Sequence, residues 1–418
     1  MKIALDIPAR KRTVAALVLA LAALYVGLAA REFVASWLGG RAQLASLERA
    51  AWLDPGNAEY RNHLGRYYDL VMRDPAGALP HYRAAVGLNP HSARFWFDLA
   101  GAYQVLGNTA SQSAALEHAI QADSMTPDVA WEAANLYLVQ GENEKALREF
   151  RVVMANDAPL GATAVRFCWR IKPDVDALLR DVIPQNADAY VSFLFLLEEK
   201  QETAGTFKVW KALIDTHQPF ELRLVYDYVR FLIQHKEVDE AVTVWQQAAG
   251  PFGLSSYLPS SSNLIVNGSF NLDVLNGGFD WQYEKQSGVT LNYDYNNFHA
   301  GRRSLLITLD GPRITDAGLY QLIPVQSSTT YEFSAFYKAG ELEGAGGPHL
   351  AIQDMYSQAV YYDSDELQPT GFWKSVEGEF TTSPDCKLVV LHVRRLPEGN
   401  PIRGKLWVDD FHLTKKSS

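Results

Sequence analysis

Aromatic side chains that lie close to carboxylates and amides give one part of this sequence a clear chemical potential. The strongest combinations are Gln353, Asp354, Tyr356, Tyr361, Tyr362 and Trp373. Sugar rings stack their apolar C–H faces on Tyr and Trp, while carboxylates and amides form hydrogen bonds with the sugar hydroxyls. This combination indicates a candidate carbohydrate-binding surface. The alternative is that these rings pack the interior of their domain or seal it against a neighbouring one.

The sequence carries no recognised catalytic arrangement. It has no G-x-S-x-G nucleophile motif, no H-E-x-x-H zinc motif and no phosphate-binding glycine loop. The ten histidines lack metal-ligand spacing, and Cys168 and Cys386 fall in different predicted domains, which excludes a disulfide framework. We therefore predict that the protein is not an enzyme. A glycan-modifying enzyme with an unrecognised site is the remaining catalytic alternative.

Length and charge narrow the classes further. A chain of 418 residues is too long for one core and predicts two or three domains. The net charge of -10 and a pI near 5.5 argue against nucleic acid as a partner, because phosphate binding needs a concentrated basic surface.

The amino-terminal segment has the pattern of a membrane helix. A basic cluster that ends at Arg12 precedes an uncharged apolar run over residues 14–30, which Arg31 and Glu32 close. About 17–20 apolar residues can cross a bilayer, and the basic end stays in the cytoplasm. We predict that residues 1–31 form a cytoplasmic stub and an inner-membrane anchor. The alternative is a signal peptide cleaved near residues 27–29; in both cases the bulk of the chain is exported.

Helical periodicity with a spacing of about 34 residues follows this segment. The clearest unit orders a large aromatic, Leu, a small residue, Tyr, a Gly turn and a second helix at Trp96, Leu99, Ala100, Tyr103, Gly107, Leu116 and Ala119. This order resembles the tetratricopeptide repeat, whose stacked helical hairpins form a solenoid. Clear repeats cover about residues 57–159 and degenerate ones residues 160–250. Residues 32–250 are therefore predicted as one α-solenoid.

The resemblance implies that first-helix residues line a concave, ligand-binding face. Carried over to this sequence they are Glu59, Asn62, Arg66 and Asp69, then Arg94, Phe97 and Gln104, then Asp128, Trp131 and Asn135. Mixed charge with exposed aromatics suits an extended peptide or a helix of an envelope protein partner. The alternative is an ordinary solvated face.

The periodicity changes after residue 250. Residues 251–262 are rich in Ser and Pro and predict a linker. Short alternating segments such as 330–337 and 406–413 then predict an antiparallel β-sandwich over residues 263–418. The predicted chain is thus multidomain α + β, with a transmembrane helix, an α-solenoid and an antiparallel β-sandwich.

The β-region resembles jelly-roll carbohydrate-binding modules with a galactose-binding-like fold. Residues 263–270 match their opening and residues 407–413 their closing strand, while residues 278–281 resemble a subgroup found beside tetratricopeptide repeats in bacterial envelope proteins. In many relatives a structural calcium ion occupies the position of Asp409 and Asp410, so calcium is the one cofactor predicted. Asn271 stands where an acidic residue is usual, which weakens that site.

Together these modules predict a non-catalytic, membrane-anchored scaffold. Its helical groove would bind an envelope protein, and its sandwich would bind glycan or protein during cell-surface polysaccharide or exopolysaccharide assembly or export. The polysaccharide link rests on the family resemblance. The alternative is a purely structural interaction protein whose sandwich caps the open end of the solenoid and binds no sugar.

Overall fold

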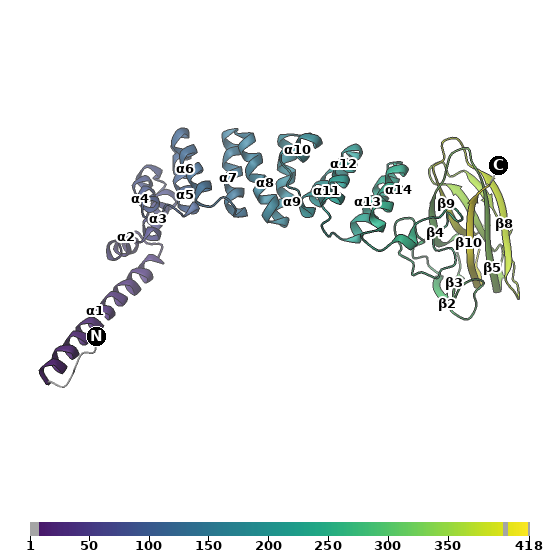
Figure 1. The fold of residues 1–418 in the computed structure, drawn as a ribbon, viewed down its shortest axis with the longest axis horizontal. Helices are drawn as coiled ribbons and strands as arrows, with labels where there is room; N and C mark the ends of the chain where they lie inside the picture. The colour runs from purple at the N-terminus through teal and green to yellow at the C-terminus, as the bar shows by residue number, and fades with distance from the viewer. Residues whose placement is uncertain (1–7, 396–399, 417–418) are drawn as a thin grey trace. The chain divides into compact units, whose positions relative to one another are not determined.

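The computed structural model describes residues 8–395 and 400–416. Within these residues, fourteen α-helices precede ten β-strands (Figure 1). The chain forms two compact units, unit 1 (residues 1–196) and unit 2 (residues 197–418). Unit 2 therefore contains the last helices as well as the β-region, and the division falls within a helix rather than at residues 251–262.

Unit 1 consists of helices that pack in antiparallel hairpins, with α3 on α4, α5 on α6 and α7 on α8 (Figure 1). Its helices are α1 (Pro8–Gly39), α2 (Leu44–Leu53), α3 (Ala58–Arg66), α4 (Pro75–Leu88), α5 (Ala93–Val105), α6 (Thr109–Ala122), α7 (Pro127–Gln140), α8 (Asn143–Asn156), α9 (Ala158–Ile171), α10 (Val175–Asp181) and most of α11 (Ala187–Lys200). A π-helical turn, Tyr67–Val71, follows α3. This arrangement fits a helical solenoid.

Short polar side chains fix the starts of several of these helices. Asn57, Asp74, Asn108, Asp157 and Asp174 each accept a hydrogen bond from a backbone N–H in the first helical turn. A cap of this kind stabilises a helix by about 1 kcal/mol, because it satisfies a donor that has no partner within the helix.

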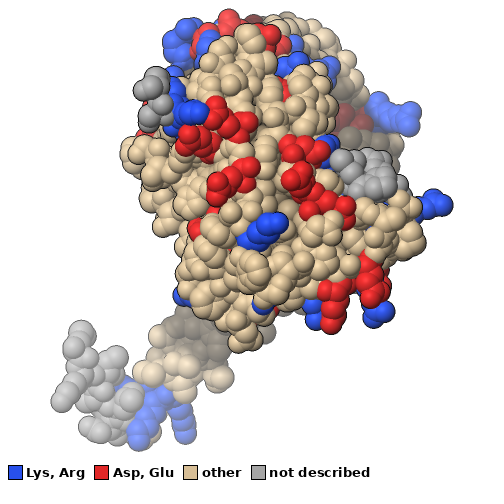
Figure 2. Space-filling view, turned by 90° about the vertical axis from the view of Figure 1, so that its right-hand side faces the viewer, with Lys and Arg blue, Asp and Glu red and all other residues tan. Residues whose placement is uncertain are grey.

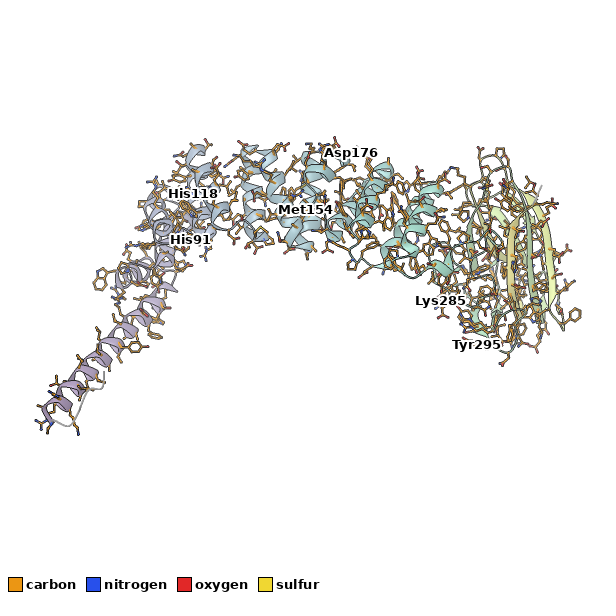
Figure 3. The ribbon with its side chains drawn as sticks, in the orientation of Figure 1. His91, His118, Met154, Asp176, Lys285 and Tyr295 are labelled. Carbon is orange, nitrogen blue, oxygen red and sulfur yellow. The ribbon has the colours of Figure 1, made fainter. Side chains whose placement is uncertain are left out.

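Small residues let the hairpins pack closely. A Cβ atom on Gly65 would lie 2.5 Å from the Tyr82 ring, and one on Gly161 would lie 3.2 Å from the Cα atom of Met154. Figure 3 shows Met154 among the helices of unit 1. The predicted hairpin at Trp96 is present, and the imidazole of His118 stacks on the Trp96 ring with 4.5 Å between ring centroids.

Helix α1 is long and apolar enough to cross a membrane by length and composition, and it is the one such helix in the described residues. Its apolar side chains are exposed along the candidate span. An amino-terminal signal sequence has the same properties, so the helix fits either prediction. Lys2, part of the predicted basic stub, lies outside the described residues.

Unit 2 begins with helices that continue directly into the β-region. They are α12 (Thr203–Asp215), α13 (Leu222–Gln234) and α14 (Val238–Ala249), followed by a 3-10 helix, Ser255–Tyr257. Hydrogen bonds join the predicted linker to the helix before it and to the loop after it. Trp245 Nε1 donates a hydrogen bond to the Tyr257 carbonyl (3.0 Å), and the Tyr257 hydroxyl donates to the Asp273 carbonyl (2.8 Å).

Two antiparallel sheets pack face to face in the rest of unit 2, which confirms the predicted α + β class and β-region. Their orders are β1-β4-β9-β6-β7 and β2-β3-β10-β5-β8. The strands are β1 (Gln282–Tyr283), β2 (Val289–Asp294), β3 (Ser304–Gly311), β4 (Asp316–Pro324), β5 (Thr330–Gly344), β6 (Pro348–Asp354), β7 (Val360–Asp363), β8 (Lys374–Thr381), β9 (Leu388–Arg395) and β10 (Ile402–Lys415). Phe270, Trp281, Phe333 and Phe411 fill the core between them.

Candidate functional site

The predicted sugar-binding residues do not form one exposed surface. Asp354 and Tyr361 instead form hydrogen bonds that stabilise the turn after β6 and its contact with Ser383. The Asp354 carboxylate is buried and accepts the backbone N–H groups of Tyr356 and Ser357, both at 2.8 Å. The Tyr361 hydroxyl donates to Ser383 Oγ at 2.9 Å. These groups hold the chain after β6 and are not free for sugar hydroxyls.

Tyr356 and Tyr362 are also engaged inside the protein. The Tyr356 hydroxyl donates to the Ile233 carbonyl of α13 at 2.8 Å, and the Tyr362 hydroxyl donates to the Glu377 carbonyl at 3.2 Å. Burial raises the pKa of each phenol to about 12. Tyr356 joins the sandwich to α13, as the alternative role for these rings predicts, while Tyr362 packs within the sandwich.

Gln353 and Trp373 are associated with different sheets. Gln353 belongs to β6 and its amide donates to Gln358 Oε1 at 3.0 Å. Trp373 precedes β8 and lies edge-on to His299, which stacks on Phe336 at 3.5 Å. Figure 2 shows the side of the molecule that carries the sheet β2-β3-β10-β5-β8. Acidic side chains gather on this side between stretches of uncharged surface.

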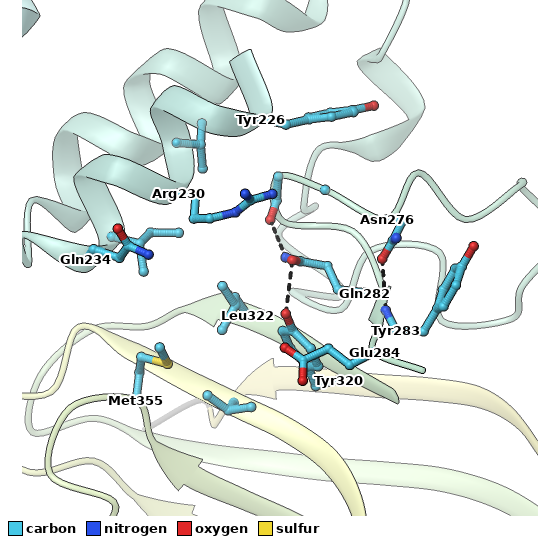
Figure 4. A pocket seen from close by; sticks show the side chains of 15 residues that line it. Tyr226, Arg230, Gln234, Asn276, Gln282, Tyr283, Glu284, Tyr320, Leu322 and Met355 are labelled. Atoms are coloured by element: carbon cyan, nitrogen blue, oxygen red, sulfur yellow. Dashed lines mark hydrogen bonds between the residues drawn. The ribbon is translucent and has the colours of Figure 1, made fainter. Parts of the chain in front are cut away.

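A groove of about 590 Å³ between α13 and the outer face of the sheet β1-β4-β9-β6-β7 is the strongest candidate site (Figure 4). Its lining includes Tyr226, Arg230 and Gln234 from α13, Asn276, Gln282, Tyr283 and Glu284 from β1 and its flanks, and Tyr320, Leu322, Met355 and Val390 from the sheet side. Helical and β residues of unit 2 thus share one cavity.

Two glycines allow the loop before β1 to approach the helices. A Cβ atom on Gly277 would lie 2.7 Å from the Tyr226 ring, and one on Gly278 would overlap the Trp245 ring. Gly278 also has a φ of +61°, a left-handed backbone conformation that residues other than Gly rarely adopt. The loop can therefore rest on α13 and α14 and carry Asn276 into the groove.

Hydrogen bonds hold the polar side of the groove in place (Figure 4). Gln282 Nε2 donates to the Gly278 carbonyl at 3.0 Å, and the Tyr320 hydroxyl donates to Gln282 Oε1 at 3.2 Å. Burial raises the pKa of Tyr320, so its hydroxyl keeps its proton at neutral pH. The aromatic rings, amides and charged groups of this groove suit a polyhydroxylated ligand.

A polar row continues from the groove across the same sheet face. Tyr320 of β4 pairs with His392 of β9, whose Nδ1 lies 2.7 Å from Asp316 Oδ2. Further along, Arg394 forms an ion pair with Asp363. Sequence reasoning missed Tyr320, Gln282 and His392. The alternation of side chains along β4 and β9 is the signal that places such residues on one outer face.

Asp409 and Asp410, the predicted calcium ligands, have other partners. Asp409 Oδ2 accepts the backbone N–H groups of His299 and Ala300 at 2.7 and 2.9 Å, and its Oδ1 accepts that of Asp410 at 2.8 Å. Asp410 faces His299 and His412. The described residues contain no group of three or more His, Cys, Asp or Glu side chains that could hold a metal ion. Calcium binding remains a prediction, and the backbone N–H groups that already donate to the Asp409 carboxylate do not fit it.

The predicted groove residues of unit 1 lie in different environments. Asn62 and Phe97 are buried, Glu59 lies 3.8 Å from Arg94, and Asn135 Nδ2 donates to the carbonyl of Trp131 in its own helix. Arg66, Asp69, Gln104 and Trp131 are partly exposed, and Asp128 is exposed. Sequence reasoning omitted two acidic residues of the same first helices, Asp98 and Glu132.

Comparison with known proteins shows what the β-domain is similar to. Residues 262–397 match the family model described as a carbohydrate binding domain. The C-terminal part of this chain is therefore similar to carbohydrate-binding modules. A search of curated proteins found no relative.

Several solved structures are similar to this chain at low identity. A structure described as "CBM4 structure and function" has 16% identity and a TM-score of 0.29, with 36% of this chain and 99% of that chain covered. The CBM22-1 xylan-binding domain of Xyn10C from Paenibacillus barcinonensis has 15% identity and a TM-score of 0.26, over 36% and 94% of the two chains. MamA has 21% identity and a TM-score of 0.24, over 42% and 86%.

Proposed function

We propose that this protein binds a glycan in the groove between α13 and the sheet β1-β4-β9-β6-β7. The observation that carries the proposal is the match of residues 262–397 to a carbohydrate binding domain. The groove supports it, because its volume of about 590 Å³ lies within the range of small-ligand sites and several tyrosines line it.

The groove's residues have distinct roles in this proposal. The partly exposed Tyr320 ring offers a stacking face, and its hydrogen bond with Gln282 fixes both side chains before the ligand arrives. Such preorganisation lowers the entropic cost of binding. Arg230 and Glu284 supply charged hydrogen-bonding groups, which bind more strongly than neutral ones. The binding of a glycan requires no nucleophile–base pair, and we propose that the groove binds its ligand without catalysis.

Glycan binding by the full chain in detergent, measured on a glycan array and then by calorimetry, tests this proposal. Tyr320→Ala should weaken binding of the retained glycan about tenfold, the loss expected for one aromatic stacking contact. Phe372→Ala is the matched control, because that ring is 73% exposed and lies outside the lining of the groove. If no glycan is retained, the function is wrong. If only Phe372→Ala weakens binding, the location is wrong.

We also propose that the helical hairpins, of tetratricopeptide type, act as a scaffold for an envelope protein partner. The α1 helix would anchor the chain in the inner membrane with its bulk exported, in a system that assembles or exports a surface polysaccharide. The stacked hairpins of unit 1 support this role, since repeat stacks usually present binding surfaces. Protease treatment of spheroplasts tests the orientation, and cross-linking followed by mass spectrometry tests the partner.

A further inference from the structure

A pocket of about 350 Å³ lies at the carboxyl end of α1 in unit 1, and we call it the α1 pocket. Residues 39–42, where α1 ends, form one side of it. Residues of α3 and of the π-helical turn, among them His63, Arg66 and Leu70, form the other side. Because the candidate membrane helix supplies part of the lining, the position of this pocket relative to a bilayer follows from α1.

Helix α1 joins the first helices of unit 1 by direct packing. Ala35 of α1 is fully buried in an apolar cluster that includes Leu47 of α2 and Tyr60 of α3. A Cβ atom on Gly39 would overlap the Tyr60 ring, so only Gly allows this close approach. His63 Nδ1 lies 3.3 Å from the Gly39 carbonyl, a distance at which it can donate a hydrogen bond. The α1 pocket is therefore held at the end of the helix.

Exposed aromatic residues place the end of α1 at the surface of a bilayer. Phe33 and Trp37, one helical turn apart, are 73% and 54% exposed. Tryptophan side chains favour the headgroup level of a membrane. Gly39 follows Trp37 by two residues, which is about 3 Å along a helix axis. If α1 crosses a membrane, the α1 pocket lies at the depth of the lipid headgroups.

The fully charged side chains that line the α1 pocket are basic. They are Arg41 and Arg66, and the described residues of the lining include no Asp or Glu. The Arg41 guanidinium lies 3.6 Å from the centre of the Trp37 ring. This stacking uses the flat face of the guanidinium, so its N–H edges stay available for hydrogen bonds. Guanidinium groups bind phosphate through paired, charge-assisted hydrogen bonds. The pocket thus suits a phosphate group.

Apolar side chains lie beside these arginines. Leu70 and Val71 line the pocket and are 64% and 61% exposed, and the neighbouring Met72 is 55% exposed. They follow from the π-helical turn, in which the backbone N–H of Met72 donates to the Tyr67 carbonyl at 3.1 Å. Turns of this type often occur at functional sites. Three consecutive exposed apolar residues next to a phosphate-binding pair match the two parts of a phospholipid, its headgroup and its acyl chains.

We propose that the α1 pocket binds an anionic phospholipid and holds the first hairpin of unit 1 against the membrane surface. Arg41 and Arg66 bind the phosphate, and Leu70 and Val71 contact the acyl chains near the glycerol group. The proposal rests on the proposed anchoring of α1 and adds a second, lipid-specific contact to it. Basic pockets next to membrane helices are suited to anionic headgroups in this way.

Binding of a fluorescent phosphatidylglycerol or phosphatidylcholine to the full chain in detergent, followed by anisotropy, tests the chemistry. We expect phosphatidylglycerol to bind more tightly. Arg41→Gln and Arg66→Gln should each weaken its binding about fivefold, the effect of one basic side chain beside an anionic lipid. Arg49→Gln is the matched control, because this exposed arginine of α2 lies outside the lining. Inorganic phosphate should displace the lipid no better than sodium chloride of the same ionic strength; stronger displacement assigns the pocket to a free anion and overturns the lipid.

The depth of the π-helical turn tests the location. Met72→Cys provides one reactive thiol, because Cys168 and Cys386 are buried. A fluorophore on this thiol, with the full chain in nanodiscs, should be quenched by lipids that carry brominated acyl chains. Met125→Cys is the matched control, since Met125 is 64% exposed and lies between α6 and α7, outside the pocket. We expect quenching at position 72 and none at position 125.

The mature amino terminus separates failure of the lipid site from failure of the anchor. If mass spectrometry finds residues 1–39 intact, three results overturn the lipid site and leave the anchor standing. They are equal affinity for the two lipids, unchanged binding in both arginine variants, or no quenching at position 72. A mature chain cleaved near residues 27–29 overturns the anchor and the lipid site together.

Discussion

Replacement of Asp280 by asparagine should change how the stability of unit 2 depends on pH. Asp280 is fully buried in the loop that carries the groove residues before β1. Its Oδ2 accepts the backbone N–H of Leu275 at 2.7 Å, while its Oδ1 has no partner among the described residues. Burial raises the pKa of this carboxyl to about 7 from an ordinary value of 3.8.

The direction of the effect follows from proton binding. Because the pKa of Asp280 is higher in the folded protein, the folded state holds more protons than the unfolded state between about pH 4 and pH 7. The free energy of unfolding therefore falls as the pH rises through this range, and the loss is complete above it. A difference of about three pKa units corresponds to about 4 kcal/mol. Asp280→Asn removes this loss, because the amide carries no charge at any pH.

Thermal and urea unfolding, followed by tryptophan fluorescence between pH 4.5 and 8.5, measures the difference between the two proteins. We expect the stability of Asp280→Asn relative to the natural chain to rise by about 2–3 kcal/mol between pH 5 and pH 8. Asp310→Asn is the control, since this carboxylate is exposed. The reasoning is refuted if the difference between the natural chain and Asp280→Asn is the same at pH 5 and pH 8.

Three shorter predictions concern the same unit. Gly278→Ala should destabilise it by about 2–4 kcal/mol, because the new methyl group overlaps a tryptophan ring at a left-handed position, whereas Gly371→Ala, which meets open space, should change thermal stability little. Tyr356→Phe should cost about 1 kcal/mol in urea unfolding, since the Ile233 carbonyl loses its donor; an unchanged midpoint would contradict this. Addition of calcium or EDTA should leave the melting temperature unchanged within 1 °C, because backbone N–H groups already surround the Asp409 carboxylate, and a shift of several degrees would restore the calcium site.

The helical hairpins and the β-region could be predicted because their information is local. Leu99, Ala100 and Tyr103 repeat at the spacing of one helix face, and all three are buried. The strands are also predictable from local pattern, because inward residues such as Leu406 and Val408 alternate with outward ones. Local periodicity therefore determines the class of each region without knowledge of its neighbours.

The candidate site could not be predicted, because it depends on contacts between distant segments. Tyr356, Tyr361 and Tyr362 are close in the sequence, yet their hydroxyls donate to three distant segments, namely α13, Ser383 and β8. Tyr320 looks like an ordinary strand residue, and its role appears only when α13, some ninety residues earlier, lies against the sheet. Composition also misrepresents residues 251–262, since Trp245 binds the Tyr257 carbonyl and orders this Ser-rich segment.

The shared construction of the groove predicts that the sandwich needs its last helices. A fragment of residues 263–418 lacks the α13 wall and uncovers Leu322 and Met355, apolar groups that line the groove. It also loses the contact of Asp239 with Lys387 at 2.5 Å. We expect this fragment to melt below a fragment of residues 197–418 and to bind the glycan more weakly. If the shorter fragment binds with full affinity, then α13 only covers the sheet, and recognition belongs to the β-domain alone.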